Sequence, residues 1–265
     1  MITSRANPTI KAIRALRQRK EREATGRFWI EGIRIVAEAI QMGAALETLV
    51  VAPELLYSAF ARELVDAQQT AGCNILAVSA DVFASLSGKD GPQGLAAVGQ
   101  QRWHTLTDLD PAAGLGWIAL YAISDPGNLG TILRTSDAVG GAGVILLGDC
   151  TDPYDPATAR ASMGALFTQK LVKTSWAAFA TWQHMSGWAV VGAADSAPTP
   201  YRTLRYPSPL ILLMGSEREG LSGEQQAMCD ALVSIPMRGQ ADSLNLAVAT
   251  GVLLYEILYQ RETRD

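Results

Sequence analysis

Residues 235–246 (IPMRGQADSLNL) combine a short apolar run, a glycine-containing loop and the start of a long apolar stretch. The pattern predicts a strand, a loop and then a helix, with two small polar side chains, Ser243 and Asn245, at the junction. The first turn of a helix leaves backbone N–H groups without partners and carries a partial positive charge. Such a junction can hold a small charged ligand largely through backbone groups. Ser243 could also be the N-cap of the helix and nothing more.

Two further clusters have the same strand-to-helix character. Residues 124–137 (SDPGNLGTILRTSD) contain Asn128 and Arg134, and residues 213–222 (LMGSEREGLS) contain Glu217 between two glycines. Each cluster follows an apolar run that predicts a strand, and open α/β sheets bind ligands at the carboxyl ends of their strands. Taken alone, Asn128 could be a plain N-cap and Arg134 a surface residue. Three such clusters in one chain indicate a single site.

The elements that would position these clusters alternate between strand and helix, which is typical of an α/β protein. Residues 1–99 predict a small α/β domain, residues 100–115 a polar linker, and residues 116–265 a second α/β domain with continuous apolar strands, as in a parallel sheet covered on both faces. In the first domain we expect helices over 7–21, 32–40 and 53–69 and strands over 28–31, 46–51, 74–78 and 94–98. In the second domain we expect strands at 117–123, 143–147, 169–172, 188–191, 210–214 and 232–235, and helices at 129–139, 156–166, 175–185, 224–230 and 244–260. Residues 198–209 hold four prolines and predict an extended loop.

The charge is unevenly distributed. The net charge is −4, but residues 1–27 carry eight basic and two acidic side chains, a local charge of +6. A basic arm on an acidic body favours contact with nucleic-acid phosphates, through residues such as Arg5, Lys11, Arg14 and Arg17. The alternative is a solvated helix face with ordinary ion pairs.

Composition excludes several classes of protein. No apolar run approaches the about 18 residues of a membrane span, and the N-terminus lacks a secretory signal. The three cysteines lie far apart without metal-ligand spacing, which predicts buried reduced thiols in a cytoplasmic protein and no metal site. The last expected helix is apolar on nearly every side, so it is buried either by core packing or by a partner subunit.

In their order and chemistry, the three clusters resemble the motifs of the SpoU (TrmH-type) family of RNA ribose 2′-O-methyltransferases, in the SPOUT superfamily. The resemblance runs from Trp117 to the C-terminus, and residues 154–165 (YDPATARASMGA), which include Arg160, also look like a family segment. The pattern of Ser4, Asn7-Pro8, Lys11, Phe28 and Glu31-Gly32 resembles the family's N-terminal RNA substrate-binding domain, which is similar to small ribosomal RNA-binding α/β proteins.

The resemblance implies a parallel-sheet SPOUT domain with a trefoil knot, and a homodimer with S-adenosylmethionine bound in the knot beside the subunit interface. The residues implied to line the cofactor cleft, largely through backbone, are Met214, Gly215, Ile235, Met237 and Leu244. Those implied to form the catalytic surface are Asn128, Arg134, Glu217, Ser243 and Asn245. Those expected to bind RNA are Arg5, Lys11, Arg14, Arg17 and Arg160.

The implied chemistry is reasonable for these residue types. A methyl sulfonium is already a strong electrophile and needs no metal, whereas a ribose 2′-hydroxyl is a very weak acid that must be aligned and deprotonated. Arg134 is the candidate for handling this proton, either as a base or, because a guanidinium pKa exceeds about 12, as a stabiliser of the alkoxide. Asn128 and Ser243 would orient the ribose or Arg134.

We therefore predict methyl transfer to a ribose in structured RNA, ribosomal RNA rather than tRNA. The alternatives are a tRNA 2′-O-methyltransferase, a methyltransferase acting on a base or a small molecule, and a non-catalytic RNA-binding or ribosome-assembly protein.

Overall fold

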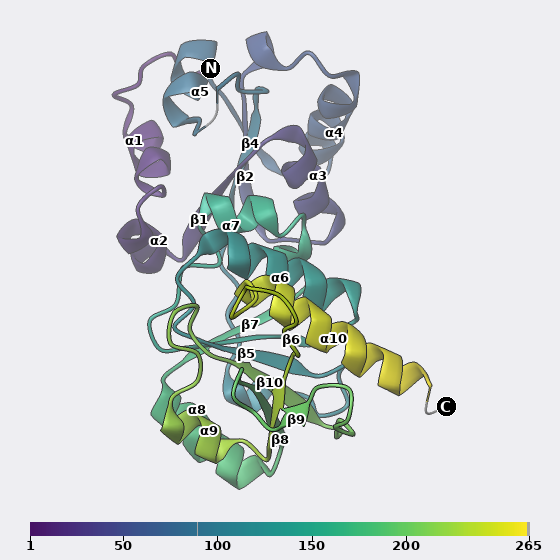
Figure 1. Cartoon of the computed structure of the whole chain (residues 1–265). Coiled ribbons are helices and arrows are strands. Elements are labelled where there is room, and N and C mark those ends of the chain that lie inside the picture. The colour runs from purple at the N-terminus through teal and green to yellow at the C-terminus, as the bar shows by residue number, and fades with distance from the viewer. Residues whose placement is uncertain (89, 264–265) are drawn as a thin grey trace. The chain divides into compact units, whose positions relative to one another are not determined.

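The chain folds into two compact units in the computed structural model, which describes residues 1–88 and 90–263 (Figure 1). The first unit comprises Met1–Gln101 with Asp152–Phe167, and the second comprises Arg102–Thr151 with Thr168–Asp265. Residue 89 of the expected domain 1–99 and residues 264–265 of the expected domain 116–265 lie outside the described residues. The sequence assigned the whole of 116–265 to the second domain, whereas the segment Asp152–Phe167 packs with the first unit.

The first unit is built on a mixed four-stranded sheet. Its strand order is β1 (Arg27–Glu31), β4 (Leu95–Gln100), β2 (Leu46–Val51) and β3 (Asn74–Ala77), with β4 antiparallel to both neighbours and β2 parallel to β3. The helical elements are α1 (Pro8–Ala15), α2 (Arg19–Thr25), α3 (Ile33–Gln41), η1 (Pro53–Leu55), α4 (Ala59–Thr70), α5 (Ala80–Leu86), α7 (Pro156–Ala161) and η3 (Ala165–Phe167). Apolar residues of α1 and α5 pack with Trp29 on one face of the sheet and form a hydrophobic core.

The single helix expected over residues 7–21 is wrong: the chain breaks between α1 and α2. Asn7 caps α1 through its side chain and Pro8 opens it, as the sequence predicted. The buried guanidinium of Arg22 explains the break, because its Nη1 donates to the carbonyls of Leu16 (3.0 Å) and Arg17 (2.9 Å). These contacts satisfy carbonyl groups that the end of a helix leaves unpaired.

The same guanidinium anchors the segment Asp152–Phe167 to the first unit. Arg22 Nε donates to Asp152 at 2.6 Å and Nη2 donates to Asp155 at 3.3 Å, and the side chains of Arg22 and Asp152 are only 2% and 8% exposed. Phe28 of β1 adds an aromatic contact with Tyr154, with ring centroids 4.9 Å apart. A buried charge is tolerated only when it is paired, so the ion pairs of Arg22 hold together two parts of the chain that are distant in sequence.

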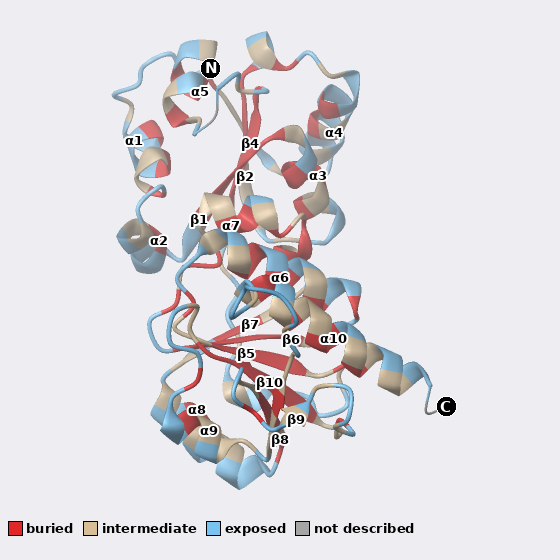
Figure 2. Ribbon diagram, in the orientation of Figure 1, coloured by how far each residue is buried: buried red, intermediate tan, exposed pale blue. Residues whose placement is uncertain are grey.

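The second unit contains a fully parallel seven-stranded sheet, which confirms the predicted α/β class. The strand order is β7 (Lys170–Thr174), β6 (Gly143–Leu147), β5 (Trp117–Tyr121), β10 (Leu210–Met214), β8 (Ala189–Ala193), β11 (Ala231–Ser234) and β9 (Thr199–Pro200). The helical elements are η2 (Leu106–Asp108), α6 (Pro126–Ala138), α8 (Trp176–Ser186), α9 (Gly223–Met228) and α10 (Leu246–Glu262). Figure 1 shows α6 and α10 on one side of this sheet and α8 and α9 on the other. The strands are buried accordingly, and β6 and β10 are buried at every position (Figure 2).

One expectation about the second half of the chain needs correction: residues 198–209 are not wholly a loop, because Thr199–Pro200 forms the short edge strand β9 beside β11. In the single chain, one face of helix α10 is buried and Val248, Tyr255 and Tyr259 are 52–63% exposed, so core packing does not cover the whole helix. In the part of the chain that the structure describes, no helix is long and apolar enough to cross a membrane.

Candidate active site

The first cluster forms the junction between β5 and α6. Asp125, not Asn128, is the N-cap of α6: its carboxylate accepts the backbone N–H of Asn128 at 2.6 Å, and Pro126 occupies the first turn. The carboxylate of Asp125 suits this position better than the neutral amide of Asn128 would, because its negative charge also interacts favourably with the helix dipole. The side chain of Asn128 is thereby left available for other contacts.

The second cluster is a tight turn after β10, at the centre of the sheet. Ser216 and Gly220 exchange backbone hydrogen bonds across the turn, at 3.2 and 3.1 Å. A side chain at Gly215 is impossible without rearrangement, since its Cβ would lie 2.1 Å from the carbonyl carbon of Gly220. Glycine here therefore allows the chain to fold back on itself and present Glu217 toward α6.

Glu217 receives donors from the neighbouring junction. Its carboxylate accepts the backbone N–H groups of Ser124 (3.1 Å) and Asp125 (3.2 Å), the Ser124 hydroxyl (3.2 Å) and the Asn128 side-chain amide (3.3 Å). Partial burial alone would raise the pKa of Glu217, but the hydrogen bonds from Asp125, Ser124 and Asn128 outweigh it and hold the pKa below its ordinary value. Glu217 is therefore an ionised acceptor that fixes the start of α6, and a poor proton acceptor at neutral pH.

The third cluster joins this network through Asn245. Asn245, not Ser243, is the N-cap of α10, and its Oδ1 accepts the N–H groups of Ala247 (2.9 Å) and Val248 (3.3 Å). Its Nδ2 donates to Oδ1 of Asn128 at 2.9 Å. Glu217, Asn128 and Asn245 therefore form a continuous chain of hydrogen bonds between the three clusters that the sequence singled out.

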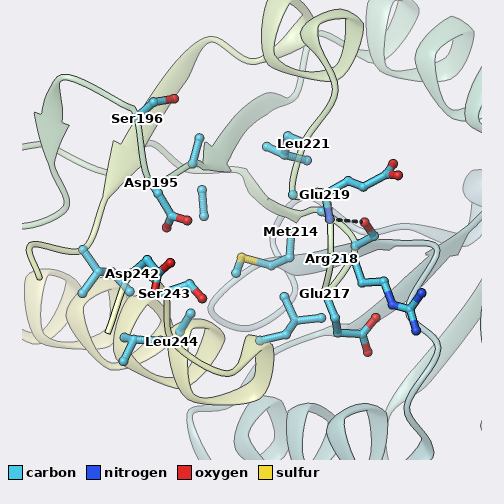
Figure 3. Close-up of a pocket in the computed structure, with 18 of the residues that line it drawn as sticks. Asp195, Ser196, Met214, Glu217, Arg218, Glu219, Leu221, Asp242, Ser243 and Leu244 are labelled. Atoms are coloured by element: carbon cyan, nitrogen blue, oxygen red, sulfur yellow. Dashed lines mark hydrogen bonds between the residues drawn. The ribbon is translucent and has the colours of Figure 1, made fainter. Parts of the chain in front are cut away.

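A pocket of about 460 Å³ opens beside this network, at the carboxyl ends of β8, β10 and β11 (Figure 3). Its volume lies in the range of about 300–1,000 Å³ usual for small-molecule sites. All five residues expected at a cofactor cleft line it, namely Met214, Gly215, Ile235, Met237 and Leu244, together with Glu217 and Ser243 of the expected catalytic set.

Some residues that line the pocket were not predicted from the sequence. Asp195 and Ser196, in the loop after β8, and Asp242 also line the pocket. Figure 3 shows Asp195 and Asp242 on the same side of the pocket as Ser243, and Glu217 and Arg218 on the other side of Met214. The rule that ligands bind at the carboxyl ends of strands would have pointed to Asp195, because it follows a strand that the sequence predicted.

The charges of the lining suit a cationic ligand. Four carboxylates, those of Asp195, Glu217, Glu219 and Asp242, line the pocket with one guanidinium, that of Arg218. A small molecule with an apolar ring system and a positive charge matches such a lining. Within residues 1–88 and 90–263, no group of three or more His, Cys, Asp or Glu side chains is placed to hold a metal ion.

Arg134 does not join the other expected catalytic residues. It lies on α6, six residues after Asn128, where it is exposed and is not part of the pocket lining. Among the described residues it makes no hydrogen bond or ion pair. The guanidinium is thus free to bind an external group.

The residues expected to bind RNA all fall in the first unit, and most of them have structural partners. Arg5 pairs with Asp81, Arg14 donates to Ser85, and Arg17 donates to the carbonyls of Leu86 and Ser87. Lys11 and Arg160 are exposed and have no such partner among the described residues.

The network gives a prediction for the pH dependence of stability. The pKa of Glu217 is lower in the folded protein than in the unfolded chain. Its ionised carboxylate therefore stabilises the fold at pH values above the unfolded-state pKa of about 4.3, and this stabilisation is lost as the pH falls through the folded-state pKa. Glu217→Gln should therefore be less stable than the wild type at neutral pH, and the difference should shrink as the pH falls below about 4.3. Urea unfolding of both proteins over this pH range measures it, and a difference independent of pH would contradict the assignment of Glu217 as an ionised acceptor.

Comparison with known families matches both units. Residues 117–255 match the family described as the SpoU rRNA Methylase family, and residues 7–97 match the MRM3-like substrate binding domain. The first match spans the three clusters and the pocket, and the second runs from the start of α1 into β4 of the first unit.

Individual relatives are similar over nearly the whole chain. The chain is 32% identical to the 23S rRNA (uridine(2479)-2′-O)-methyltransferase of Streptomyces viridochromogenes, over 93% of this chain and 87% of that protein. It is 28% identical to the 23S rRNA (guanosine(2553)-2′-O)-methyltransferase of Bacillus subtilis, over 97% of this chain and 98% of that protein. Among solved structures, an AdoMet-bound rRNA methyltransferase from Sinorhizobium meliloti is similar with a TM-score of 0.87 and 40% identity, over 97% of this chain and 96% of that chain.

Proposed function

The chain belongs to the SpoU rRNA Methylase family, and on that premise we propose that it transfers the methyl group of S-adenosylmethionine to a ribose 2′-hydroxyl of ribosomal RNA. The observation that carries the proposal is the hydrogen-bonded chain Glu217–Asn128–Asn245 beside the pocket at the carboxyl edge of the sheet. Relatives named as 23S rRNA 2′-O-methyltransferases, and a similar structure with bound AdoMet, support both the reaction and the cofactor.

S-adenosylmethionine fits the pocket by size and charge. Met214, Ile235, Met237 and Leu244 supply apolar surface, and Gly215 lines the pocket without a side chain. The carboxylates around the pocket complement the positive charge of a sulfonium and of an ammonium group. When bound, the cofactor supplies an electrophilic methyl group that needs no metal.

The protein's task is to align and deprotonate the ribose hydroxyl. In the transfer, a bond forms between the 2′-oxygen and the methyl carbon, the carbon–sulfur bond breaks, S-adenosylhomocysteine leaves, and the hydroxyl proton is released. Alignment by fixed groups can lower such a barrier by about 7–11 kcal/mol. We assign the orientation of the ribose to Ser243, which lines the pocket, and to Asn128, which is hydrogen-bonded to the lining residue Glu217.

We assign Glu217 a positioning role and Arg134 the stabilising role. Glu217 already accepts four donor groups and has a depressed pKa, so it holds Asn128 rather than removing a proton. Arg134 is the free cation on the same helix as Asn128, and a guanidinium with a pKa above about 12 stabilises an alkoxide better than it accepts its proton.

We further propose that the protein is a homodimer that uses α10 and α6 at the interface. Val248, Tyr255 and Tyr259 are spaced seven and four residues apart, so they lie on one helical face, and they are exposed in the single chain. Large exposed apolar side chains in a row favour an interface. The contact between α6 and α10 would bring Arg134 to the same region, where it could serve the pocket of either subunit.

Three other expectations stay predictions. The domain limits 1–99, 100–115 and 116–265 assign RNA recognition mainly to the N-terminal domain, with Arg5, Lys11, Arg14 and Arg17 as phosphate contacts, and Arg160 of the range 116–265 is expected to add another. The trefoil knot follows from the family resemblance, as does binding of the cofactor within it. A cytoplasmic location fits a protein that acts on ribosomal RNA.

The substrate class is tested with labelled S-adenosylmethionine and RNA from cells that lack this gene. Incubation of the full chain with rRNA should incorporate label, and incubation with tRNA should not. Label in tRNA alone would keep the chemistry and overturn the proposed substrate. No label in either RNA, with no binding of S-adenosylmethionine in calorimetry, would overturn the enzyme in favour of a non-catalytic RNA-binding protein.

A further inference from the structure

The first unit contains a cavity of about 160 Å³ that none of the three motif clusters lines. Five parts of the chain line it: Arg17 after α1, Trp29, Ile30 and Glu31 of β1, Ile35 of α3, Gly88 after α5, and Pro156, Ala159 and Arg160 of α7. All of these belong to the first unit. The cavity is smaller than the about 300–1,000 Å³ of drug-sized sites, so it suits one ring or one small group.

The cavity exists because α7 packs beside β1 (Figure 1). The buried ion pairs of Arg22 with Asp152 and Asp155 hold the start of α7 in this place. Arg17 and Arg160 are 143 positions apart in the sequence, and the packing of α7 brings both to one cavity. The sequence had marked both as RNA contacts but offered no reason for them to act together.

The lining combines apolar surface with a tryptophan whose indole N–H is unpaired. Ile30, Ile35 and Ala159 are buried side chains that supply apolar walls. Trp29 is only 4% exposed, and its indole N–H has no hydrogen-bond partner within the described residues. A buried donor without a partner is costly, and an acceptor on a ligand would satisfy it.

The rim carries positive charge. Arg160 is exposed and makes no hydrogen bond or ion pair with other described residues. Arg17 is held by the carbonyls of Leu86 and Ser87 through one nitrogen, Nη2, which leaves further N–H groups for an anion. The carboxylate of Glu31 accepts hydrogen bonds from the Ser87 hydroxyl and from the backbone N–H of Gly88 (2.9 Å), so its charge is engaged by donors.

We propose that this cavity binds one unpaired nucleotide of the RNA substrate, with the base in the apolar interior beside Trp29 and a phosphate between Arg17 and Arg160. Proteins that read RNA by sequence or shape commonly splay out single bases and hold them against aromatic and guanidinium groups. The inference rests on the proposed action on RNA and deepens it, because it gives the first unit a specific recognition site besides its general positive charge.

The direct test is a titration of the full chain followed by NMR of its tryptophan indole N–H groups. The chain has six tryptophans, and the Trp29 signal is identified by its loss in Trp29→Phe. Adding the four nucleoside 5′-monophosphates in turn should shift the Trp29 signal, and inorganic phosphate should shift it much less. Arg160→Ala should weaken nucleotide binding about tenfold, which corresponds to about 1.4 kcal/mol and is of the size expected for one charge-assisted contact.

Two matched variants separate the cavity from general charge. Ala159→Leu fills the interior without changing charge and should abolish the Trp29 shift, while the other indole signals report that the protein is folded. Lys20→Ala removes one exposed positive charge outside the lining and should titrate like the wild type. If no nucleotide shifts the Trp29 signal, if Arg160→Ala and Ala159→Leu bind like the wild type, or if inorganic phosphate acts as strongly as nucleotides, the proposal is overturned.

A second readout separates this inference from the proposed function. In methyl transfer to rRNA, Arg160→Ala should raise KM for the RNA about tenfold and leave kcat nearly unchanged, because Arg160 binds substrate away from the reacting atoms. If Arg160→Ala methylates rRNA like the wild type, the cavity has no part in RNA recognition and the enzyme assignment stands. If nucleotides shift the Trp29 signal but no RNA is methylated, the cavity proposal stands and the enzyme assignment fails.

Discussion

Arg134→Ala is expected to lower the turnover of methyl transfer about 10²–10³-fold while the affinity for S-adenosylmethionine stays close to that of the wild type. The magnitude is that of losing one group that stabilises developing negative charge in a transition state. Cofactor affinity should persist because Arg134 does not line the pocket. Single-turnover kinetics with saturating rRNA, and calorimetry with the cofactor, measure the two quantities separately.

Arg205→Ala is the matched control for that experiment. Arg205 is an exposed arginine of the same unit that lies outside both the pocket lining and the network of Glu217, Asn128 and Asn245. It should methylate rRNA at the wild-type rate. Equal, near-normal turnover in both variants would remove Arg134 from catalysis, and a parallel loss of cofactor binding in Arg134→Ala would show a structural defect instead.

Arg22→Ala is expected to cost about 3–5 kcal/mol of unfolding free energy, a large share of the about 5–15 kcal/mol typical of a folded protein. The variant leaves the buried carboxylate of Asp152 without its partner and removes the donor to the carbonyls of Leu16 and Arg17. Urea unfolding measures the loss. Limited proteolysis should also cut within Asp152–Phe167, because that segment loses its anchor to the first unit.

The control for Arg22 is Arg19, one turn earlier on the same helix. Its pair with Glu23 is about 40–50% exposed on both sides, and exposed pairs contribute about 0–1 kcal/mol. Arg19→Ala should therefore change the unfolding free energy little. A loss below about 1 kcal/mol in Arg22→Ala would mean that water or rearrangement compensates the buried charge.

Strands were predictable where burial alone decides them. The apolar runs at 143–147 and 210–214 form strands with these same limits, since each run ends at a glycine, and residues 46–51 do so although they include Glu47 and Thr48. Periodicity could not reveal the break between α1 and α2. That break depends on Arg22, whose partners at residues 152 and 155 lie more than a hundred positions away.

The candidate site likewise combines features that local sequence predicts with features that depend on contacts between distant residues. The three clusters were visible because their polar residues follow predicted strands, and the structure joins them through Glu217, Asn128 and Asn245. The N-cap residues were less predictable, because several adjacent residues can cap a helix and backbone geometry decides which one does. The joint use of Arg17 and Arg160 was invisible, since only the packing of α7 against β1 brings them together.

The measurement that tests the central claim most directly is the position of the transferred methyl group. Ribosomal RNA labelled by the protein from S-adenosylmethionine is digested with alkali, which cleaves next to a free 2′-hydroxyl and not next to a 2′-O-methyl group. Our account predicts that the label appears in alkali-resistant dinucleotides. Label found only in mononucleotides would place the methyl group on a base and contradict it.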